Sequence, residues 1–398
     1  MIKPFQFLSS QDIEDFKSIQ LKYPYKRGIS LQVHISDIHF GVMDAETEYK
    51  ILKEQFIDRI GDLPLDLISI DGDLFNKLDM SNTDALLYAR LFVSHIVNLC
   101  IVNKLRGVPT TFLIEMGTKN HDAGQLRLFY HYLNDPDIDI RIVENIQFEY
   151  INGLKVLCIP ELYGISEEEY NKFLWQSGDY DMCFMHGTVQ GAVYGDNAGE
   201  SRLFRPEDFG NCLGPVIAGH VHPGGCYHSF IYYNGSPIRW SFGEEGPKGF
   251  QIVLYDMDTR KHYIYLEQIK SFRYDTISID DLLLSDPKDV IDYINTLKEK
   301  EGIDYLRLKC TQTDSNQDTI KLIQEYYRTN KTIKFKLEKL LSPDEKNMDQ
   351  KNSDLYEKYK YIFDKSMSPY DILARFISDN EQDILISGEE ILNLLKET

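Results

Sequence analysis

The chain has 398 residues, of which 42% are hydrophobic and 27% charged, as expected of a globular protein with two or three domains. No apolar run approaches the roughly 18 residues of a membrane span, and the first residues do not resemble a secretory signal. The six cysteines form no C-x-x-C pair, so neither a zinc knuckle nor a disulfide framework is indicated. We therefore expect a cytoplasmic protein with reduced thiols and no membrane association.

The net charge of −20 arises from 43 basic and 63 acidic residues. This balance weighs against a nucleic-acid binder, because contacts to phosphate need local positive charge. It does not exclude one, since a metal site supplies its own positive charge and basic residues can gather on one face.

After a polar lead of residues 1–29, strands and helices alternate. The stretches "ISLQVHIS", "LDLISI" and "TTFLIEM" have the composition of strands, and "TEYKILKEQFIDRI" and "DALLYARLFVSHIVNLCIV" have that of helices. Strand and helix alternation at these lengths predicts a parallel sheet with crossover helices. The second helix is apolar nearly all round, so we expect it to be covered on more than one side.

The next segment is richer in strands. "QFEYINGLKVLCIP" predicts a hairpin with Asn152-Gly153 at its turn. "YDMCFMH" and "GPVIAGH" are short apolar strands that each end in His, and two antiparallel pairs follow. These elements complete a first domain of residues 30–268.

From Phe272 the pattern restarts as strand, helix, strand, helix and strand, which predicts a small βαβαβ domain at residues 270–341. Residues 342–354 have the composition of a linker. Residues 355–398 contain amphipathic helices, whose apolar stripes need either a partner protein or the first two domains to cover them.

Polar residues follow five of the predicted strands where each strand ends. They are Asp37 and His39, Asp73, Asn120 and His121, His186, and His220 and His222. Because ligand sites of open α/β sheets lie outside the carboxyl ends of the strands, we expect these residues at one edge. Such a set of oxygen and nitrogen ligands without thiolate suits Mn, Fe or Zn. The carboxylate of Asp73 can bridge two ions. We expect structural roles for His34, His95, His131, His228 and His262.

The motif order D-x-H, G-D, N-H-D, H-G, G-H-x-H resembles that of the calcineurin-like metallophosphoesterase superfamily over residues 31–222. Within residues 232–253, N-G-S-x-x-R, G-E and K-G-F resemble the SbcD-type (meiotic recombination eleven) nuclease subunit. The resemblance implies an α/β two-sheet sandwich with flanking helices, followed by a capping domain. It also implies that the helical tail binds an SbcC-type, SMC-like ATPase.

The resemblance further implies two divalent metal ions, with Mn²⁺ the expected metal. One ion is held by Asp37, His39, Asp73 and His222. The other is held by Asp73, Asn120, His186 and His220. His121 is expected to face the phosphate as general acid, with Asp122 orienting it, while water activated by the two ions acts as nucleophile.

The sequence departs from the family pattern at three places. Asn76 stands where the family often has His, Thr118 and Lys119 separate Gly117 from the N-H-D motif, and the N-terminal lead is long. A diverged form encoded by a virus or mobile element would fit these differences. Candidate substrate-binding residues are Asn76, Lys119, Ser236 and Arg239; Lys119 either contacts DNA phosphate or is simply solvated.

Three functions remain open at this point. The first is a metal-dependent DNA nuclease, with 3′–5′ exonuclease and endonuclease activity, that processes DNA ends in recombination and double-strand-break repair. It would act with an SbcC-type ATPase as a homodimer, joined through the helix at residues 83–102 unless that helix is buried under the sheet. The second is a phosphatase or phosphodiesterase acting on a substrate other than DNA. The third is a non-catalytic scaffold. The complete set of ligand residues argues against it.

Overall fold

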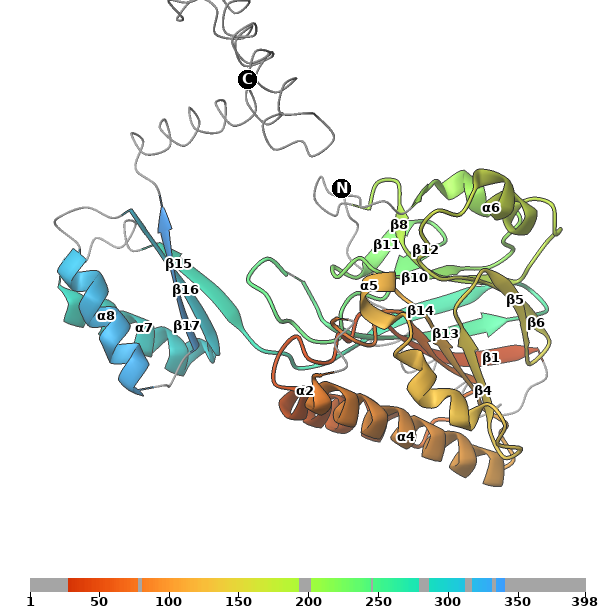
Figure 1. The fold of residues 1–398 in the computed structure, drawn as a ribbon, viewed down its shortest axis with the longest axis horizontal. Helices are drawn as coiled ribbons and strands as arrows, with labels where there is room; N and C mark the ends of the chain where they lie inside the picture. Colours follow the sequence, from red (N-terminus) through yellow and green to blue (C-terminus); the bar gives the residue numbers. More distant parts are fainter. Residues whose placement is uncertain are drawn as a thin grey trace, which may run out of the picture. The chain divides into compact units, whose positions relative to one another are not determined.

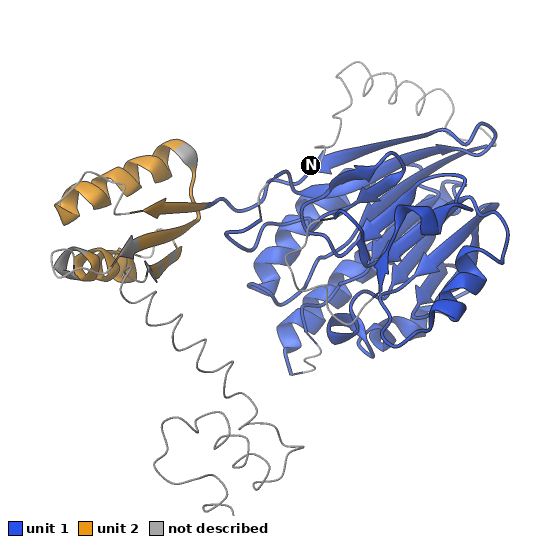
Figure 2. Cartoon of the chain, turned by 90° about the horizontal axis from the view of Figure 1, so that it is seen from above, with its two compact units in different colours: residues 1–274 blue, residues 275–398 orange. Residues whose placement is uncertain are grey.

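The computed structural model describes residues 28–77, 81–192, 202–244, 246–278, 286–311, 317–330 and 334–340. The chain divides into two compact units, residues 1–274 and residues 275–398 (Figure 2). Most of the N-terminal lead, the linker at 342–354 and the helical tail at 355–398 lie outside the described residues.

The first sheet of unit 1 contains six strands in the order β14-β13-β1-β2-β3-β4. Four of them run parallel, namely β1 (Ile29–Ile35), β2 (Leu67–Asp71), β3 (Thr111–Glu115) and β4 (Asp139–Val143). The other two, β13 (Gly249–Asp256) and β14 (His262–Gln268), continue the sheet in antiparallel pairing. The strand–helix alternation in the sequence therefore predicts the parallel part of this sheet correctly.

Helices cover the outer face of the first sheet, where their apolar side chains pack into one core with alternate strand residues. These helices are α2 (Ala45–Leu52), the π-helical turn η1 (Lys53–Ile57), α3 (Asp58–Ile60) and α4 (Thr83–Leu105). Among the described residues, α4 is the one helix whose length and composition would suit a membrane span. It buries Ala89, Phe92, Val93 and Ile96 in the core, as a core helix does.

The second sheet also has six strands, in the order β11-β12-β10-β7-β6-β5. They are β5 (Gln147–Ile151), β6 (Leu154–Ile159), β7 (Met182–His186), β10 (Val216–Gly219), β11 (Gly225–His228) and β12 (Ile231–Tyr233). The predicted hairpin joins β5 to β6, and Asn152 and Gly153 both have positive φ at its turn. Helix α6 (Glu167–Leu174) packs Tyr170 and Leu174 on this sheet's outer core.

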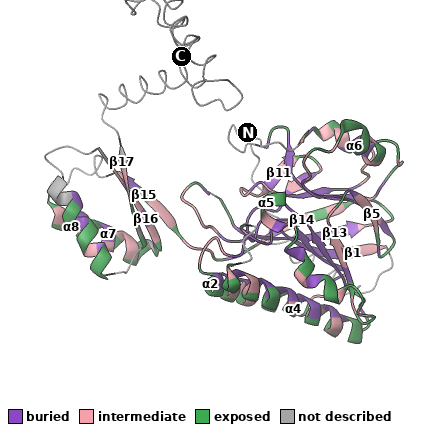
Figure 3. Cartoon of the chain, viewed as in Figure 1, coloured by how far each residue is buried: buried purple, intermediate pink, exposed green. Residues whose placement is uncertain are grey.

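The two sheets face each other across an inner apolar core, so unit 1 has helix, sheet, sheet and helix layers (Figure 1). Leu67, Leu113 and Val253 from the first sheet meet Val156, Phe184 and Ile217 from the second in that core. Figure 3 shows the strands as largely buried and the outward side of α4 as exposed. The observed fold is thus mixed α/β with two large mixed sheets.

Shorter elements complete unit 1 around the edges of the sheets. They are α5 (Lys119–Asp122), the 3₁₀ helices η2 (Leu126–Tyr132) and η3 (Pro206–Phe209), and the paired strands β8 (Thr188–Val189) and β9 (Leu203–Phe204).

Unit 2 has the element order that its sequence predicts. It contains β15 (Tyr274–Ser278, whose first residue falls in unit 1), α7 (Pro287–Glu301), β16 (Tyr305–Thr311), α8 (Gln317–Asn330) and β17 (Lys334–Leu340). The sheet order is β15-β16-β17, and Val290, Ile294, Leu306 and Ile323 belong to its own buried core. A role of this unit in capping DNA stays a prediction.

Candidate metal centre

The five polar strand ends come together in space, but they belong to two sheets rather than to one. The ends of β1, β2 and β3 lie on the first sheet, and those of β7 and β10 lie on the second. The expectation of a single sheet edge is therefore wrong, because short apolar strands carry no signal of which sheet they join. Facing edges of two sheets supply the site instead.

Three groups of His and Asp side chains in unit 1 could hold metal ions. They are Asp37, His39 and His222; His39, Asp73 and His121; and Asp73, His186 and His220. Within each group, one ligand atom from each residue lies within 4.8 Å of the others. His39 and Asp73 each belong to two groups, so the three groups form one continuous cluster.

The backbone of this cluster is strained. Asp37, His39 and Asp73 have φ values of 54°, 55° and 53°, and His220 has a φ of 91°. Residues other than glycine seldom adopt this left-handed region, and such residues gather at functional sites. Four of the seven predicted ligands are therefore held in a conformation that local propensity disfavours.

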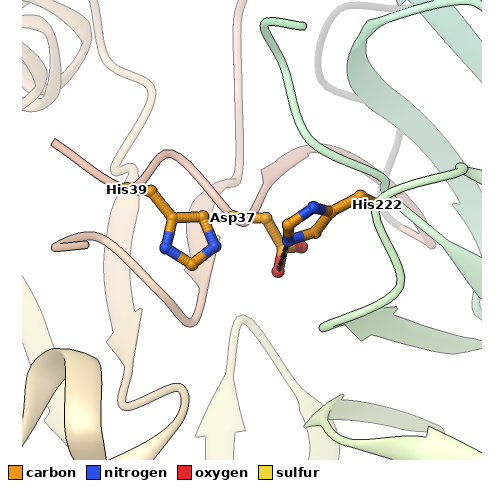
Figure 4. Close-up of side chains that lie close together, drawn as sticks. All are labelled: Asp37, His39 and His222. Carbon is orange, nitrogen blue, oxygen red and sulfur yellow. Dashed lines mark ion pairs between the residues drawn. The ribbon is translucent and has the colours of Figure 1, made fainter. Parts of the chain in front are cut away.

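The first group joins the loop after β1 to the loop after β10 (Figure 4). Nε2 of His222 lies 3.8 Å from Oδ1 of Asp37, whose carboxylate also accepts hydrogen bonds from the backbone N–H of His220. The Asp37 and His39 side chains are buried and that of His222 is half-buried. The group is thus open to solvent on the His222 side.

The group of Asp73, His186 and His220 centres on Asp73 and is called the second group from here on. Nε2 of His186 lies 3.3 Å from Oδ2 of Asp73, and Nδ1 of His186 lies 2.9 Å from the backbone oxygen of Asp71. Since the Asp71 carbonyl can only accept, Nδ1 of His186 carries a proton. Burial lowers the pKa of His186, but the carboxylates of Asp73 and Asp37 outweigh it and raise that pKa well above its usual range, so without an ion Nε2 is protonated as well. Because Nδ1 is fixed as the donor, release of the Nε2 proton to a metal ion leaves His186 in the tautomer that a metal ligand needs.

A polar network between the sheets fixes Asp71. Its carboxylate lies 2.9 Å from Nδ1 of His34 and accepts a hydrogen bond from Nδ2 of Asn234 at 2.7 Å. All three side chains are buried. His34 thus has the structural role that the sequence predicts for it, and the network holds the strand that positions Asp73.

Glycines leave room for the cluster. A Cβ on Gly72 would lie 2.2 Å from Nδ1 of His186, and one on Gly117 would lie 2.1 Å from the backbone N of Asp73. A Cβ on Gly219 would lie 2.3 Å from the backbone oxygen of Asp71. Any side chain at these positions would displace the backbone that carries the ligands, so all three sites require glycine.

The charges in the cluster favour metal binding. Burial raises the pKa of Asp73, but the neighbouring His186 and His39 outweigh it and hold that pKa well below its usual range. Burial lowers the pKa of His39 to about 4, against the opposing effect of Asp73 and Asp37. An ionised carboxylate and a neutral imidazole are the forms that bind metal.

Several ring nitrogens of the cluster also lack hydrogen bonds. Both ring nitrogens of His39 and Nε2 of His186 are buried and make no hydrogen bond within the described part of the chain. Buried polar atoms are rarely left unpaired, and each such atom calls for an explanation. Nitrogen and carboxylate donors that converge in this way fit divalent transition metals, so the residues fit the ions that the sequence predicts.

The loop after β3 differs from what its motif implies. The backbone N–H of Thr118 donates to Oδ1 of Asp73 at 2.6 Å, and its hydroxyl lies 3.2 Å from Oδ2. Asn120, the predicted ligand, has an exposed side chain in α5. The two residues that follow Gly117 therefore bring Thr118, in place of Asn120, against the central carboxylate.

Asp122 also takes another role. Its two carboxylate oxygens accept the backbone N–H of Phe75 at 3.0 Å and of Gly117 at 2.8 Å. It thus ties the loop after β2 to the loop after β3 instead of orienting His121, whose buried Nδ1 makes no hydrogen bond in the described part of the chain. The His121 ring lies against that of His39, with 4.8 Å between ring centroids.

Two buried glutamates lie against the paired histidines after β10: Glu161, which no motif includes, and Glu244 of the G-E element. Oε2 of Glu161 is 3.3 Å from Nδ1 of His220, and Oε1 of Glu244 is 3.3 Å from Nδ1 of His222. Burial raises the pKa of Glu161, but His220 and His186 outweigh it and lower that pKa to about 2. Glu161 follows a buried strand directly after Pro160, which is the same strand-end signal that identifies the other site residues.

Side chains from the segment after β12 complete the wall beside the first group. The Trp240 ring lies edge-on to His39 and His222, with centroid distances of 5.0 and 4.8 Å. Nζ of Lys248 is 3.0 Å from Oε2 of Glu244. The G-E and K-G-F elements of the sequence therefore border the metal centre.

The four predicted substrate-binding residues lie in different settings. Ser236 is buried and accepts a hydrogen bond from Nζ of Lys248 at 2.6 Å, so it belongs to the interior rather than to a substrate surface. Arg239 donates through Nη2 to the backbone oxygen of Gly246 at 3.3 Å. Lys119 is exposed and Asn76 is half-buried at the end of the loop after β2. The substrate-binding roles of all four residues stay predictions.

Comparison with known proteins adds little to this picture. No family model matches the chain, and no curated protein matches it. The crystal structure of the nuclease MPE of Pseudomonas putida is similar over 56% of this chain and 84% of that chain, with 12% identity and a TM-score of 0.24. A likeness of that size carries no argument, so the candidate function rests on the site itself.

Proposed function

We propose that this protein is a metal-dependent nuclease that hydrolyses phosphodiester bonds of DNA. The observation that carries the proposal is the continuous His and Asp cluster of three groups, with strained ligand backbone and unpaired buried ring nitrogens. Asp37, His39 and His222 would hold one divalent ion, Mn²⁺ being the expected one, and Asp73, His186 and His220 would hold another. The chemistry that such ions supply is activation of water and neutralisation of phosphate charge.

The chain's own residues supply orientation and a proton. Asp73 would contribute to both ion positions, and the backbone oxygen of Asp71 fixes Nδ1 of His186 as the donor, which leaves Nε2 to face an ion. His121, half-buried beside His39, would protonate the leaving oxygen, a role that suits an imidazole near neutral pH. Trp240 offers an aromatic surface next to the first group, on which a base could stack.

The wider proposal follows the sequence resemblance. In it, the protein processes DNA ends in recombination and repair, unit 2 caps the DNA, and the helical tail binds an SbcC-type ATPase. The exposed Leu87, Leu91 and Leu105 of α4 would provide the contact of a homodimer.

The test is cleavage of matched substrates by purified full-length protein loaded with Mn²⁺. Duplex ends and single-stranded DNA should be cleaved faster than a chromogenic phosphodiester and much faster than a phosphomonoester, and chelation should abolish all cleavage. Activity on the small phosphodiester alone would favour the alternative, a phosphodiesterase with a substrate other than DNA, which the net charge of −20 also favours.

A further inference from the structure

The second group of the metal centre lacks one ligand that the sequence implies. Asp73, His186 and His220 lie together, but the predicted fourth ligand, Asn120, has an exposed side chain. Two residues, Thr118 and Lys119, separate it from Gly117, where the strand ends. The structure places Thr118 against Asp73 instead, so the second ion needs another donor.

Glu161 is a buried carboxylate beside His220 and Thr118, next to that gap. Its Oε2 lies 3.3 Å from Nδ1 of His220 and accepts a hydrogen bond from the Thr118 hydroxyl at 2.7 Å. That same hydroxyl lies 3.2 Å from Oδ2 of Asp73. One oxygen of Glu161 is therefore one hydroxyl away from the central carboxylate and in direct contact with a ligand histidine. Glu161 is 4% exposed, so it belongs to the protein interior.

A comparison with Glu244 shows how the charged surroundings of Glu161 differ. Both glutamates are buried and lie 3.3 Å from Nδ1 of a histidine after β10. Glu244 has Lys248 at 3.0 Å to balance its charge. Within the described part of the chain, Glu161 forms no ion pair with Lys or Arg. Its charged neighbour is His220, and an imidazole that binds metal is neutral, so the ion itself would then balance this buried carboxylate.

We propose that Glu161 is the fourth protein ligand of the second ion, in the place that the motif gives to Asn120. This inference rests on the metal centre of the proposed function and deepens it. An anionic oxygen ligand in place of a neutral amide adds one negative charge to the centre. It therefore favours hard divalent cations such as Mn²⁺ over softer ones. The Thr118 hydroxyl, which contacts both side chains, then fixes the Glu161 and Asp73 carboxylates relative to each other.

The first test counts ions on the full-length protein, without any substrate. The protein is stripped with chelator and titrated with Mn²⁺ alone, and bound metal is measured by mass spectrometry and calorimetry. Wild type and Asn120→Ala should bind two ions per chain. Glu161→Ala should keep one and bind the second more than about 100-fold more weakly, beyond the 10–100-fold loss typical of a residue that only orients a ligand. Glu168→Ala, an exposed neighbour on α6, is the matched control and should bind two ions.

A second test reports direct coordination. Glu161→Cys loaded with Co²⁺ should show a thiolate-to-cobalt charge-transfer band in the near ultraviolet, whereas Asn120→Cys should show none beyond the wild-type baseline. Circular dichroism of each metal-free variant establishes that the fold is retained.

The inference is overturned if Glu161→Ala binds the second ion within 100-fold of wild type, if Glu161→Cys gives no such band while folded, or if Asn120→Ala loses an ion. Failure of the proposed function is a separate result: a wild-type protein that binds two ions through Glu161 and cleaves no DNA would refute the nuclease and leave the ligand assignment standing.

Discussion

The two ends of the metal centre are built in the same way and completed differently. At the first group, Trp240 and the Glu244–Lys248 pair surround His222. At the second group, Thr118 and Glu161 lie beside Asp73 and His220 with no such lysine among the described residues. A carboxylate whose charge is balanced by a lysine orients its histidine, and we infer that a carboxylate without such a lysine is available to bind a metal ion. The comparison shows that two glutamates with similar contacts to histidine can serve different roles. The presence or absence of a nearby lysine distinguishes them.

Removing the residue common to both ends should have the largest effect. Asp73→Ala takes away the carboxylate that connects the two ion positions, so both ions should be lost and DNA cleavage should fall by at least about 1,000-fold. Metal content and single-turnover cleavage of an end-labelled duplex measure the two effects. Retention of two ions by a folded Asp73→Ala protein would contradict the arrangement.

Substitution of His121 should affect the cleavage step without affecting metal binding. His121→Ser should keep both ions and lower the cleavage rate by about 10²–10⁴-fold, because a positioned general acid contributes that much. The loss should be smaller for a substrate whose leaving group needs no proton, such as a nitrophenyl phosphodiester. Full activity on DNA would show that His121 has no catalytic role, and loss of an ion would show that it is a ligand of the group containing His39 and Asp73.

A substitution at Glu244 tests the first group, where Lys248 balances the charge of the glutamate. Glu244→Gln should weaken binding of the first ion by about 10–100-fold and leave the second unchanged, since it disturbs a residue that orients His222. Because the variant leaves the Lys248 ammonium buried without its partner, the double variant Glu244→Gln/Lys248→Met serves as the stability control. Loss of the second ion instead of the first would reverse the assignment of the two ends.

The smallest effect concerns Asp66, which lies outside both groups and serves as a reference. Burial raises the pKa of Asp66 to about 6, against the hydrogen bond from the backbone N–H of Leu31. The folded state therefore holds this proton more tightly than the unfolded chain does. The resulting stability is fully present below the usual pKa near 3.8 and is lost as pH rises through about 6.

Asp66→Asn should flatten this part of the pH dependence, which amounts to about 2 kcal/mol in the free energy of unfolding. Urea unfolding of metal-free protein between pH 4 and 7 measures it. An unchanged slope in the variant would assign the pH dependence to other carboxyl groups. Metal binding near neutral pH should be the same in both proteins.

The sequence predicts most of the first sheet and most of the cluster. Apolar periodicity identifies β1, β2 and β3 with their crossover helices, and polar residues at strand ends identify Asp37, His39 and Asp73. It does not reveal that β7 and β10 belong to a second sheet, because a short buried strand has the same composition in either one.

The loop residues could not be assigned from the motif alone. Two additional residues after Gly117 move Thr118 to Asp73 and leave Asn120 exposed, and only the backbone path shows this. Glu161 belongs to no motif, although its place after a buried strand and a proline gives the same signal as the other site residues. Polar residues at every strand end, and not only those within motifs, would therefore include Glu161 among the candidate site residues.

The left-handed backbone at Asp37, His39, Asp73 and His220 has an evolutionary consequence. Glycine would adopt the positive φ of each of these positions with less strain. Selection for stability and selection for activity therefore act against each other there. A lineage that no longer needed the centre would be expected to drift toward glycine or asparagine at these four positions before its core changed. Asp or His stands at all four positions in this chain, so the cluster carries a backbone strain that glycine would relieve at the expense of the ligand side chains.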